Sequence, residues 1–491
     1  MNIYENILEI LDRDIVSLTT LDNSLTAGNL QDAVSKYEGM LTPLNIKGKR
    51  IALLVPPIQE FLPLFLAINK LDGTVAPLSW QFRTEDLKNV INFLDPHIVF
   101  TITEHNGFSF SDIIMSWAKE INSEALVFTS DNCVDWKAEK FNGHSKQLEE
   151  NIGGFICFTS GSTGTPKGMV FKNTVMDYSY NQLTKAMNLK SNDNTFIYAS
   201  TSTVLGIVSM STVLKGKANL IVSNEFDLVK IINLMKESEC NKVLTTPSIF
   251  KAIYNFASKL NPEMLKKIEL VCFVGEKIPD YFVKSFPLME DCKFISHFGS
   301  SETGAIGNVF LENDSIELEY TLIDKVEAKS VDDELYVKTG AMFTEYLNNS
   351  ILTKEVYENG WYKTGDLVEF LNDNVFKIVG RKKDIIKKGG QQVVSSEVEQ
   401  IISRIEGVQG VAVVGAPHSV FGEQIVAFVV ADELTSADIR TYCTKKISSY
   451  KIPDKIIFLD ELPLNQVKVD KLKLKAQLIG DLNGKDTERK E

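Results

Sequence analysis

Short apolar segments alternate with helical patterns along most of the chain. Between the first two of these segments, residues 58–70 carry apolar side chains at helical spacing before Asp72 and Gly73 stop the pattern. The apolar segments lie at residues 51–56, 75–78, 98–102, 195–199, 218–222, 242–245 and 270–274. Such runs predict buried strands, and strands that alternate with helices form layered sheets with covering helices. We therefore predict an α/β fold whose large N-terminal domain spans residues 1–380.

The pattern changes beyond residue 375. A short strand pattern is followed by the charged stretch 380–384, and a new set of helices and strands begins after it. The helices and strands predicted there lie at residues 396–405, 408–414, 424–431 and 436–447. With 491 residues, the chain is too long for one compact core. These observations predict a second, small α+β domain over residues 381–491.

The composition argues against several classes of protein. The 52 basic and 65 acidic residues give a net charge of −13, which disfavours a nucleic-acid binder. The six cysteines are scattered, without a CxxC pair or a histidine spacing suited to zinc, and so indicate buried thiols in a reducing compartment. The start lacks the basic and apolar regions of a signal peptide, and no apolar run approaches the ~18 residues that span a membrane. We expect a cytoplasmic protein without a membrane span.

The segment from Phe158 to Gly168 has the composition of a phosphate-binding loop. It contains three glycines, five hydroxyl side chains and Lys167, and it follows a buried strand pattern. Glycine lets backbone N–H groups approach an anion, and the lysine adds a positive charge suited to a polyphosphate. Lys167 follows Pro166 and precedes Gly168, which does not fit the Walker A pattern. A flexible linker rarely joins two apolar strand patterns, so we predict a nucleotide phosphate site.

Residues 159–168 resemble the signature loop of the adenylate-forming superfamily, which includes acyl-CoA synthetases, adenylation domains of peptide synthetases and firefly luciferase. The family's other motifs follow in order. Residues 297–304 resemble its Tyr-Gly-x-Thr-Glu motif, and residues 361–367 resemble its Tyr-Arg-Thr-Gly-Asp-Leu motif. Residues 380–393 resemble its domain hinge and the loop that follows. The resemblance covers nearly the whole chain and implies a large ATP-binding domain followed by a small, mobile domain.

The resemblance implies a site for ATP and Mg²⁺. In such a site Phe298 stacks on adenine, Ser301 donates to a phosphate and Glu302 holds Mg²⁺. Asp366 accepts hydrogen bonds from both ribose hydroxyls, and Arg381 contacts the ribose or a phosphate. A flat apolar ring suits a purine, and a carboxylate suits a hard cation bound chiefly by phosphates. The implied nucleotide-binding residues are Thr159, Ser160, Gly161, Ser162, Thr163, Gly164, Thr165, Lys167, Phe298, Gly299, Ser300, Ser301, Asp366 and Arg381.

The resemblance also implies roles for lysines near the C-terminus. Lys383 occupies the hinge position, and Lys387 begins a loop over residues 387–392 that forms one wall of the thiol tunnel. The family ends with Pro-x-x-x-x-Gly-Lys, whose lysine bridges the carboxylate and the α-phosphate during adenylation. Lys468 lies one residue closer to the proline and lacks the preceding glycine, but the two residues after it match the family. Lys468 is therefore the first candidate for the adenylating lysine, and Lys471 is the alternative.

The reaction that the resemblance implies has two steps. A carboxylate attacks the α-phosphorus of ATP and displaces pyrophosphate, which gives an acyl adenylate. The small domain then rotates about the hinge, and a thiol attacks the activated carbonyl. Glu302, Lys387 and Lys468 are the implied catalytic residues, and Lys167 helps to offset the negative charge. Positioning and charge stabilisation do this work, so no enzymatic nucleophile is expected.

The expected substrate is a non-amino carboxylic acid, aryl or aliphatic. Amino-acid-activating members of the family carry an aspartate that pairs with the substrate ammonium, at a position that matches residues 202–205 here. This stretch, Ser-Thr-Val-Leu, has no carboxylate, so an ammonium would lose its ionic partner. Residues 200–211 are small and rich in hydroxyls. The residues expected to line the acid pocket are Ser202, Thr203, Gly275 and His297.

Three functions remain open. The first is an AMP-forming acid–thiol ligase that uses CoA, and the second is a stand-alone adenylation enzyme that loads the pantetheine thiol of a carrier protein. These two share all the motifs, although the net charge of −13 mildly disfavours docking to an acidic carrier protein. The third is a nucleotide-binding regulatory protein without turnover, which the irregular region around Lys468 motivates. Acid-dependent pyrophosphate exchange separates the third function from the other two.

Overall fold

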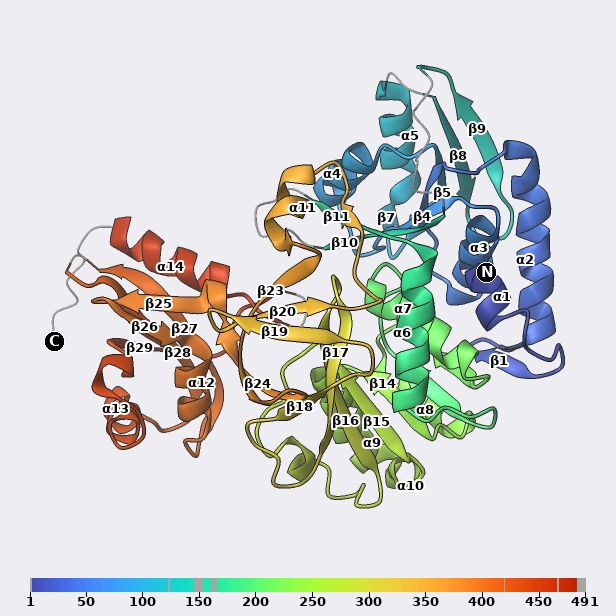
Figure 1. Cartoon of the computed structure of the whole chain (residues 1–491). Coiled ribbons are helices and arrows are strands. Elements are labelled where there is room, and N and C mark those ends of the chain that lie inside the picture. The colour runs from blue at the N-terminus through green and yellow to red at the C-terminus, as the bar shows by residue number, and fades with distance from the viewer. Residues whose placement is uncertain are drawn as a thin grey trace. The chain divides into compact units, whose positions relative to one another are not determined.

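Figure 1 shows the computed structural model of the chain, which describes residues 2–121, 124–144, 153–159, 166–418, 420–465 and 468–483. The chain forms two compact units. The large unit contains residues 1–327 and 337–362, and the small unit contains residues 328–336 and 363–491. A compact unit is defined by its internal contacts, whereas a mobile domain is defined by its motion. The predicted domain boundary at residue 380 and the hinge at Lys383 therefore stay predictions.

The large unit contains a sheet with the strand order β21-β11-β10-β4-β3-β5-β8-β9. Its strands are β3 (Arg50–Leu54), β4 (Thr74–Pro77), β5 (Ile98–Ile102), β8 (Ala125–Ser130), β9 (Lys137–Phe141), β10 (Gly154–Thr159), β11 (Lys167–Phe171) and β21 (Glu345–Tyr346). Strands β10, β4, β3, β5 and β8 are parallel. The helices between β3 and β8 are α3 (Ile58–Lys70), α4 (Thr84–Leu94) and α5 (Phe110–Glu120). The alternation of strands and helices predicted for residues 51–102 is confirmed.

A second sheet of the large unit has the strand order β18-β17-β16-β15-β14-β12-β13-β1-β2. Its strands are β1 (Val16–Thr19), β2 (Ser24–Thr26), β12 (Asn194–Ile197), β13 (Asn219–Val222), β14 (Lys242–Thr245), β15 (Leu270–Val274), β16 (Lys293–Ser300), β17 (Gly304–Leu311) and β18 (Glu319–Leu322). The strands from β16 to β1 in this order are parallel. Their carboxyl ends therefore meet at one edge, where ligands of open α/β sheets bind.

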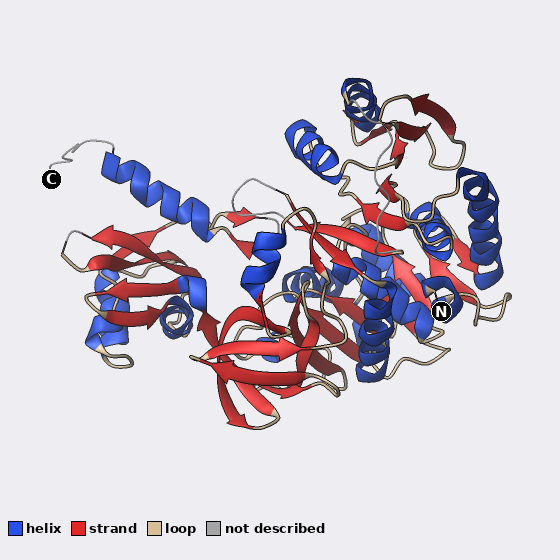
Figure 2. Ribbon diagram, turned by 45° about the horizontal axis from the view of Figure 1, so that its top comes forward, coloured by secondary structure: helices blue, strands red, loops and turns tan. Residues whose placement is uncertain are grey.

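Helices cover both faces of this second sheet, and Figure 2 shows helices flanking the strands of the large unit. On one face, α8 (Leu228–Glu237) and α9 (Pro247–Leu260) share a core cluster with apolar side chains of β12, β14, β15 and β16. The other face carries α6 (Asn173–Ala186) and α7 (Val204–Lys215). Successive side chains of a strand point to opposite faces, so Val243 of the core cluster and Lys242 mark the two faces of β14.

A buried ion pair lies at the amino end of β14. Lys242 Nζ lies 2.7 Å from Asp193 Oδ2, and the two side chains are 6% and 4% exposed. Lys242 Nζ also donates to the carbonyl oxygens of Met187 at 3.0 Å and Asn188 at 2.7 Å, directly after α6. Asp193 Oδ1 accepts from Asn241 Nδ2 at 2.9 Å. Both buried charges are thus paired and hydrogen-bonded, as their removal from water requires.

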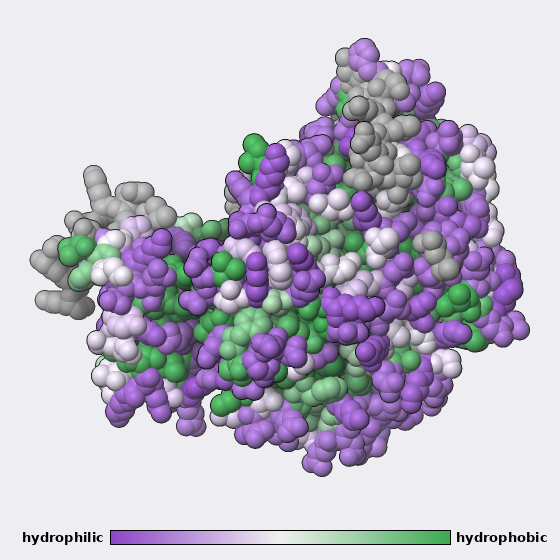
Figure 3. All heavy atoms as spheres, in the orientation of Figure 1, coloured by the Kyte–Doolittle hydropathy of each residue, from purple (hydrophilic) through white to green (hydrophobic). Residues whose placement is uncertain are grey.

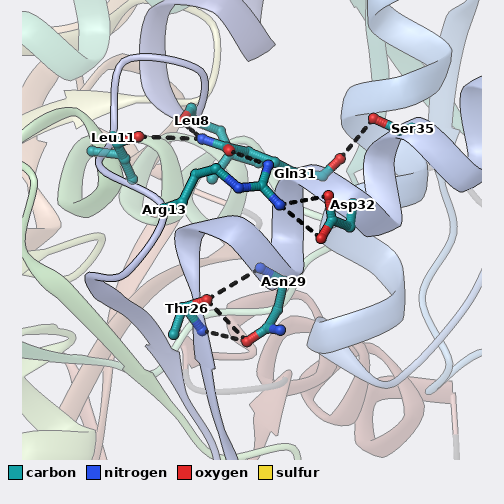
Figure 4. A network of polar contacts seen from close by, with 8 residues as sticks. All are labelled: Leu8, Leu11, Arg13, Thr26, Asn29, Gln31, Asp32 and Ser35. Carbon is teal, nitrogen blue, oxygen red and sulfur yellow. Dashed lines mark hydrogen bonds and ion pairs between the residues drawn. The ribbon is translucent and has the colours of Figure 1, made fainter.

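Polar contacts tie the N-terminal segment to α2 (Ala27–Leu41), as Figure 4 shows. Arg13 Nη2 lies 2.7 Å from Asp32 Oδ1, and Arg13 Nη1 donates to Gln31 Oε1 at 3.1 Å. Gln31 Nε2 in turn donates to two backbone carbonyl oxygens of the N-terminal segment. The first residues of the chain are therefore part of the large unit and are held by both backbone and side-chain contacts.

The small unit contains two sets of strands. The first set is β24 (Val375–Arg381) and most residues of β19 (Glu327–Val331), β20 (Glu334–Lys338) and β23 (Trp361–Asn372), whose remaining residues are assigned to the large unit. The second set forms a sheet of order β26-β25-β28-β27 with β29 beside β28. The elements of the second set are β25 (Ile385–Lys388), β26 (Gln391–Val394), α12 (Ser395–Ser403), β27 (Val408–His418), β28 (Gly422–Ala431), α13 (Ser436–Thr444), β29 (Lys455–Phe458) and α14 (Lys471–Asn483). Helices α12 and α13 pack on one face of this sheet and α14 on the other. The predicted fold class, a large α/β part followed by a small α+β part, is confirmed.

Hydrophilic residues cover most of the face drawn in Figure 3, with apolar residues scattered among them. Among the described residues, no helix has both the length and the apolar character that crossing a membrane requires. The six cysteines are free thiols, and all except Cys292 are buried. Burial raises the pKa of Cys133 and of Cys240 to about 12, so these thiols stay protonated at neutral pH.

Candidate nucleotide and acid site

The signature loop joins two antiparallel strands. Strands β10 and β11 pair so that the backbone of Thr159 lies opposite Lys167, and Phe158 lies opposite Gly168. A Cβ atom on Gly168 would lie 3.0 Å from Phe158 Cε1 and 3.2 Å from Leu347 Cβ, so packing favours glycine there. Lys167 is thus held at the first position of β11. The predicted phosphate-binding residues between the strands, Ser160, Gly161, Ser162, Thr163, Gly164 and Thr165, lie outside the described residues.

The Phe-Gly-Ser-Ser-Glu motif forms a tight turn between β16 and β17. Ser300 lies opposite Gly304, and a Cβ atom on Gly299 would lie 2.0 Å from the Gly304 carbonyl oxygen, so only glycine fits. Ser300 N donates to the hydroxyl of the threonine three residues on at 3.2 Å, which closes the turn. The turn therefore places Ser301 and Glu302 at the carboxyl end of β16.

The ring of Phe298 is half-buried on the face of β16 that also carries Ser296. Its centroid lies 5.5 Å from that of Tyr320, with 48° between the ring planes. The hydroxyl groups of Ser296 and Tyr320 are 3.3 Å apart and link the two strands further. Because Tyr320 supports the Phe298 ring, the ring is held in place while part of its surface stays accessible to a flat ligand.

A cluster of aromatic side chains lies beside Glu302. Tyr346 Oη donates to Glu302 Oε1 at 3.4 Å, and Phe343 N donates to the Glu302 carbonyl oxygen at 3.0 Å. The Phe343 ring lies 4.6, 5.5 and 5.9 Å from the rings of Tyr346, Tyr357 and Tyr362. Burial, and then the nearby Glu302 charge, raises the pKa of Tyr346 to about 12. Burial also raises the pKa of Tyr357 and of Tyr362, so all three phenols are neutral.

The surroundings of Glu302 fit a Mg²⁺ ion that arrives with ATP. Such an ion takes most of its ligands from phosphates and water and needs one or two carboxylates from the protein. Among the described residues, no group of three or more His, Cys, Asp or Glu side chains is placed to hold a metal ion by itself. A single carboxylate oriented by the neutral hydroxyl of Tyr346 therefore suits a phosphate-bound cation better than a cation held by the protein alone.

The end of the signature loop lies beside the segment that contacts Glu302. Strands β11 and β21 are antiparallel neighbours, with Met169 opposite Tyr346. Leu347 N donates to the Gly168 carbonyl oxygen at 2.7 Å. Since Tyr346 also donates to Glu302, the strand pairing brings β11, which begins at Lys167, and the predicted Mg²⁺ carboxylate into one region of the large unit.

The residues predicted for the acid pocket converge at the amino end of α7. The Thr203 hydroxyl accepts from the N–H three residues on at 3.1 Å and donates to Ser200 O at 2.8 Å, so it caps the helix. Ser202 Oγ lies 2.8 Å from Ser200 Oγ. Gly275 follows β15 with a φ of +82°, and a Cβ atom there would lie 3.8 Å from Leu205 Cδ2. The segment after β15 is therefore beside the segment after β12.

His297 lies on β16, with Val274 of β15 as one neighbour and Asn308 of β17 as the other. The residue is 6% exposed, and neither Nδ1 nor Nε2 has a hydrogen-bond partner among the described residues. Burial lowers the pKa of the imidazole to about 4, so the ring is neutral at pH 7. Because Gly275 follows Val274, His297 belongs to the same sheet edge as the other predicted acid-pocket residues.

The neutral, buried state of His297 predicts a pH-dependent stability. Its pKa of about 4 in the folded protein lies below the ordinary value of 6.5, so the unfolded chain binds the proton first as the pH falls. The free energy of unfolding should therefore decrease by about 3 kcal/mol more in the wild type than in His297→Phe between pH 6.5 and pH 4. Urea unfolding followed by tryptophan fluorescence measures this in the large unit, which contains all four tryptophans.

A matched control for this titration is His144→Gln, because His144 is exposed. This variant should keep the pH dependence of the wild type. If the free energy of unfolding fell by the same amount in the wild type and in His297→Phe between pH 6.5 and pH 4, the prediction would be wrong. That result would show that His297 takes up its proton in the folded protein as readily as in the unfolded chain.

In the small unit, Asp366 and Arg381 lie opposite each other on β23 and β24. Arg381 Nε lies 2.6 Å from Asp366 Oδ1, and the aspartate side chain is 5% exposed while the arginine is 45% exposed. Asp366 N donates to Thr364 Oγ1 at 3.0 Å, and Gly365 N donates to Glu334 Oε1 at 3.1 Å. These bonds hold the Thr-Gly-Asp turn, in which Gly365 has a φ of +71°. The two predicted ribose-binding residues thus form an ion pair.

The predicted hinge and thiol-tunnel residues lie in the segment after β24. Lys383 is exposed in the short helical turn of residues 382–384. Lys387 is exposed on β25, and its backbone N donates to Glu423 Oε2 at 2.6 Å. The turn from β25 to β26 consists of Gly389 and Gly390, whose φ angles are +56° and +81°. A backbone of this kind, without side chains at its tip, allows a ligand to approach closely.

The side-chain contacts of Lys471 bear on which of the two candidate lysines serves adenylation. Lys471 Nζ lies 2.7 Å from Glu399 Oε1 and donates to Ser395 Oγ at 3.1 Å, so it links α14 to α12. Lys468 lies on β31 (Lys468–Val469), which pairs with β30 (Leu464–Asn465) in a short hairpin. The contacts of Lys471 give it a structural role in the small unit, and Lys468 stays the first candidate for the adenylating lysine.

The aromatic residues around Glu302 are functional candidates that the motifs do not reveal. Tyr346 is 44 residues from Glu302 in the sequence, and the pairing of β11 with β21 is what brings it close. Periodicity reports which face of an element is buried, but it does not report which distant strand lies beside it. Tyr362 does belong to a recognised motif, yet nothing in that motif indicates its position near Phe343.

The chain is similar to known proteins over nearly its whole length. Residues 12–344 match the family of AMP-binding enzymes, and residues 397–468 match the C-terminal domain of AMP-binding enzymes. The chain is 25% identical over 482 residues to long-chain-fatty-acid–CoA ligase FadD13 of Mycobacterium tuberculosis, which covers 93% of each chain. It is 24% identical over 488 residues to oxalate–CoA ligase of Arabidopsis thaliana, which covers 92% of this chain and 93% of that protein.

A solved structure shares the fold. ATP-bound MatB from Rhodopseudomonas palustris has a TM-score of 0.84 at 21% sequence identity, over 97% of this chain and 99% of that chain. The resemblance inferred from the motifs is thereby confirmed, as is the enzyme class at the level of the family. The chain belongs to the family of AMP-binding, adenylate-forming enzymes, carries the C-terminal domain of that family, and has acid–CoA ligases among its relatives.

Proposed function

We propose that this protein activates a non-amino carboxylic acid with ATP as an acyl adenylate and then transfers the acyl group to the thiol of CoA. The observation that best supports this function is the hydrogen bond from Leu347 N to Gly168 O, because the end of the predicted phosphate-binding loop then lies beside Tyr346, which donates to Glu302. A polyphosphate needs a lysine and a divalent cation in one place. The acid–CoA ligases among the relatives support the same chemistry.

In the first step, an oxygen of the acid attacks the α-phosphorus of ATP. A new oxygen–phosphorus bond forms, the bond to the β-phosphate breaks, and pyrophosphate leaves. Lys167 would bind the terminal phosphates, and Lys468 would reduce the repulsion between the acid and the α-phosphate. Glu302 would hold Mg²⁺, which neutralises phosphate charge when bound. The neutral phenol of Tyr346 would keep the Glu302 carboxylate oriented toward the cation.

The nucleoside would be held by an aromatic ring and by an ion-paired carboxylate. Phe298 would stack on adenine, since its ring is supported by Tyr320 on one side. Asp366 would accept hydrogen bonds from the ribose hydroxyls, and the ion pair with Arg381 fixes the orientation of its carboxylate. These contacts would position the α-phosphate for attack, and positioning of this kind contributes much of the rate in reactions without an enzymatic nucleophile.

In the second step, the thiol sulfur loses its proton to water and bonds to the acyl carbon, the bond from that carbon to the AMP oxygen breaks, and AMP leaves. Lys387 and the Gly389–Gly390 turn would lie along the path of the thiol. A carrier protein is the second candidate acceptor, because its pantetheine arm carries the same thiol. The net charge of −13 disfavours an acidic carrier protein, and the named relatives use CoA, so CoA is the acceptor that we propose.

An aromatic side chain beside the Gly389–Gly390 turn is a candidate for binding CoA in the second step. Phe421 is 47% exposed, stacks on His418 with centroids 5.0 Å apart, and accepts at its carbonyl oxygen from Gly389 N at 2.8 Å. We expect Phe421→Ala to raise the KM for CoA about tenfold, because stacking of one base on an aromatic ring contributes roughly 1–3 kcal/mol. Acid-dependent pyrophosphate exchange should stay unchanged, since it does not involve the thiol.

The matched control is Phe458→Ala, which removes another exposed aromatic ring of the small unit, at 39% exposure on β29. This variant should keep the wild-type KM for CoA. If Phe421→Ala and Phe458→Ala gave the same KM, Phe421 would have no part in binding the acceptor.

The proposed function is tested by pyrophosphate exchange with a panel of carboxylic acids, followed by addition of CoA or of a phosphopantetheinylated carrier protein. We expect pyrophosphate exchange with carboxylic acids that lack an α-amino group and no exchange with α-amino acids. We also expect thioester formation with CoA. Thioester formation with the carrier protein alone would favour the stand-alone adenylation enzyme. Absence of exchange with every acid, in a protein that still binds ATP, would favour the nucleotide-binding regulator.

A further inference from the structure

His297 is a buried polar side chain whose two ring nitrogens have no hydrogen-bond partner among the described residues. The residue is 6% exposed, and most buried polar atoms in folded proteins are hydrogen-bonded. A neutral imidazole has one N–H donor and one acceptor nitrogen, and leaving both unpaired in the interior costs free energy. A partner that arrives with the substrate would remove this cost.

The register of the sheet shows which side His297 faces. Ser296 and Phe298, its two neighbours on β16, both contact Tyr320, so the His297 side chain points to the opposite face. On that face, β14 carries Lys242, which bonds to the backbone directly after α6. His297 therefore points to the side of the sheet that α6 and α7 cover.

The same side holds the predicted acid pocket. Val274 is the neighbour of His297 on β15, and the chain turns at Gly275 directly after it. A Cβ atom on Gly275 would lie 3.8 Å from side-chain atoms of both Leu205, at the start of α7, and Thr246, after β14. The imidazole of His297 thus lies at the sheet edge where the carboxyl ends of β14, β15 and β16 meet the amino end of α7.

We propose that His297 is a specificity residue that selects an acid carrying a hydroxyl group, and that this hydroxyl supplies the hydrogen-bond partner that the imidazole lacks among the described residues. A hydroxyl can both donate and accept, so it pairs with whichever ring nitrogen faces it. A second carboxylate suits the site less, because it could accept only from the N–H nitrogen, and the buried imidazole, whose pKa burial lowers to about 4, would bring no charge to offset that of the carboxylate. The selection rests on the proposed function, because it concerns the acid that the enzyme adenylates.

The test uses pairs of acids that differ by one hydroxyl: benzoate with its three monohydroxybenzoates, and octanoate with hydroxyoctanoates substituted at successive carbons. We expect kcat/KM for pyrophosphate exchange to be at least about 100-fold higher for one hydroxylated acid than for its parent, since sites built to bond a hydroxyl strongly reject the analogue without it. His297→Phe should bring this ratio to about 1 by slowing the hydroxylated acid and accelerating the parent. His297→Gln, which keeps a donor and an acceptor, should retain part of the preference.

The KM for ATP should be the same in the wild type and both variants, which controls for misfolding. Equal rates for parent and hydroxylated acids in the wild type would overturn the proposal. If His297→Phe kept the preference for the hydroxylated acid, another residue would be responsible for that preference and the proposal would be wrong. Absence of exchange with every acid would overturn the proposed function and the specificity together, whereas exchange without a hydroxyl preference would overturn the specificity alone.

Discussion

Replacing Lys468 with alanine is expected to slow acid-dependent pyrophosphate exchange by roughly 100- to 1,000-fold, the usual cost of removing one group that stabilises transition-state charge. The lysine would offset the repulsion between the attacking carboxylate and the α-phosphate, so its loss should lower kcat more than it raises KM for ATP. Transfer of a synthetic acyl adenylate to CoA should proceed at nearly the wild-type rate, because that step follows the loss of pyrophosphate. Rapid-quench measurements of the two half-reactions separate these effects.

The matched control for this prediction is Lys471→Ala. Lys471 is held by Glu399 and Ser395 within the small unit, so its removal should reduce stability and leave exchange within about threefold of the wild type. If Lys471→Ala abolished exchange while Lys468→Ala exchanged normally, the adenylating lysine would be Lys471, and its contacts with α12 would have to break during the reaction.

Replacing Asp193 with alanine is expected to destabilise the large unit by about 3–5 kcal/mol, because it leaves the charge of a buried lysine without its partner. The side chain of Lys242 is 6% exposed, and its two backbone carbonyl partners carry no compensating charge. Urea unfolding followed by tryptophan fluorescence reports this directly, since all four tryptophans lie in the large unit.

An exposed ion pair provides the control for Asp193→Ala. Glu263 and Lys266 form a pair in which the side chains are 74% and 55% exposed, so Glu263→Ala should change the free energy of unfolding by about 0.5 kcal/mol or less. The double variant Asp193→Leu/Lys242→Met should recover much of the loss, because it removes both buried charges. A small effect of Asp193→Ala alone would mean that Lys242 loses its proton or reaches water in the variant.

The elements that can be predicted from the sequence are those whose apolar pattern reports burial directly. Helix α3 spans the predicted residues 58–70, and β5 spans the predicted residues 98–102. The pattern predicts that the second helix of the small unit extends to residue 447, but the helix ends at Thr444. Helix ends depend on capping and on local tertiary contacts, which a periodic pattern does not contain.

Some features of the candidate site can be predicted from sequence motifs, and others cannot. Two separate motifs predict Asp366 and Arg381, and the pairing of adjacent strands explains why they meet. The contact of Tyr346 with Glu302 depends on the pairing of β21 with β11. The lack of a hydrogen-bond partner for His297 within the described part of the chain depends on which side chains surround it in space. Residue types and spacing contain neither kind of information, so these two features required the three-dimensional structure.

The formation of an acyl adenylate is tested most directly by isotope transfer from the acid. An accepted acid labelled with ¹⁸O in both carboxylate oxygens is incubated with ATP, Mg²⁺ and CoA, and the products are analysed by mass spectrometry. Attack of the carboxylate on the α-phosphorus predicts one ¹⁸O atom in AMP and one in the thioester carbonyl. Label in pyrophosphate or phosphate, or thioester formation with unlabelled AMP, would contradict activation of the acid as an adenylate.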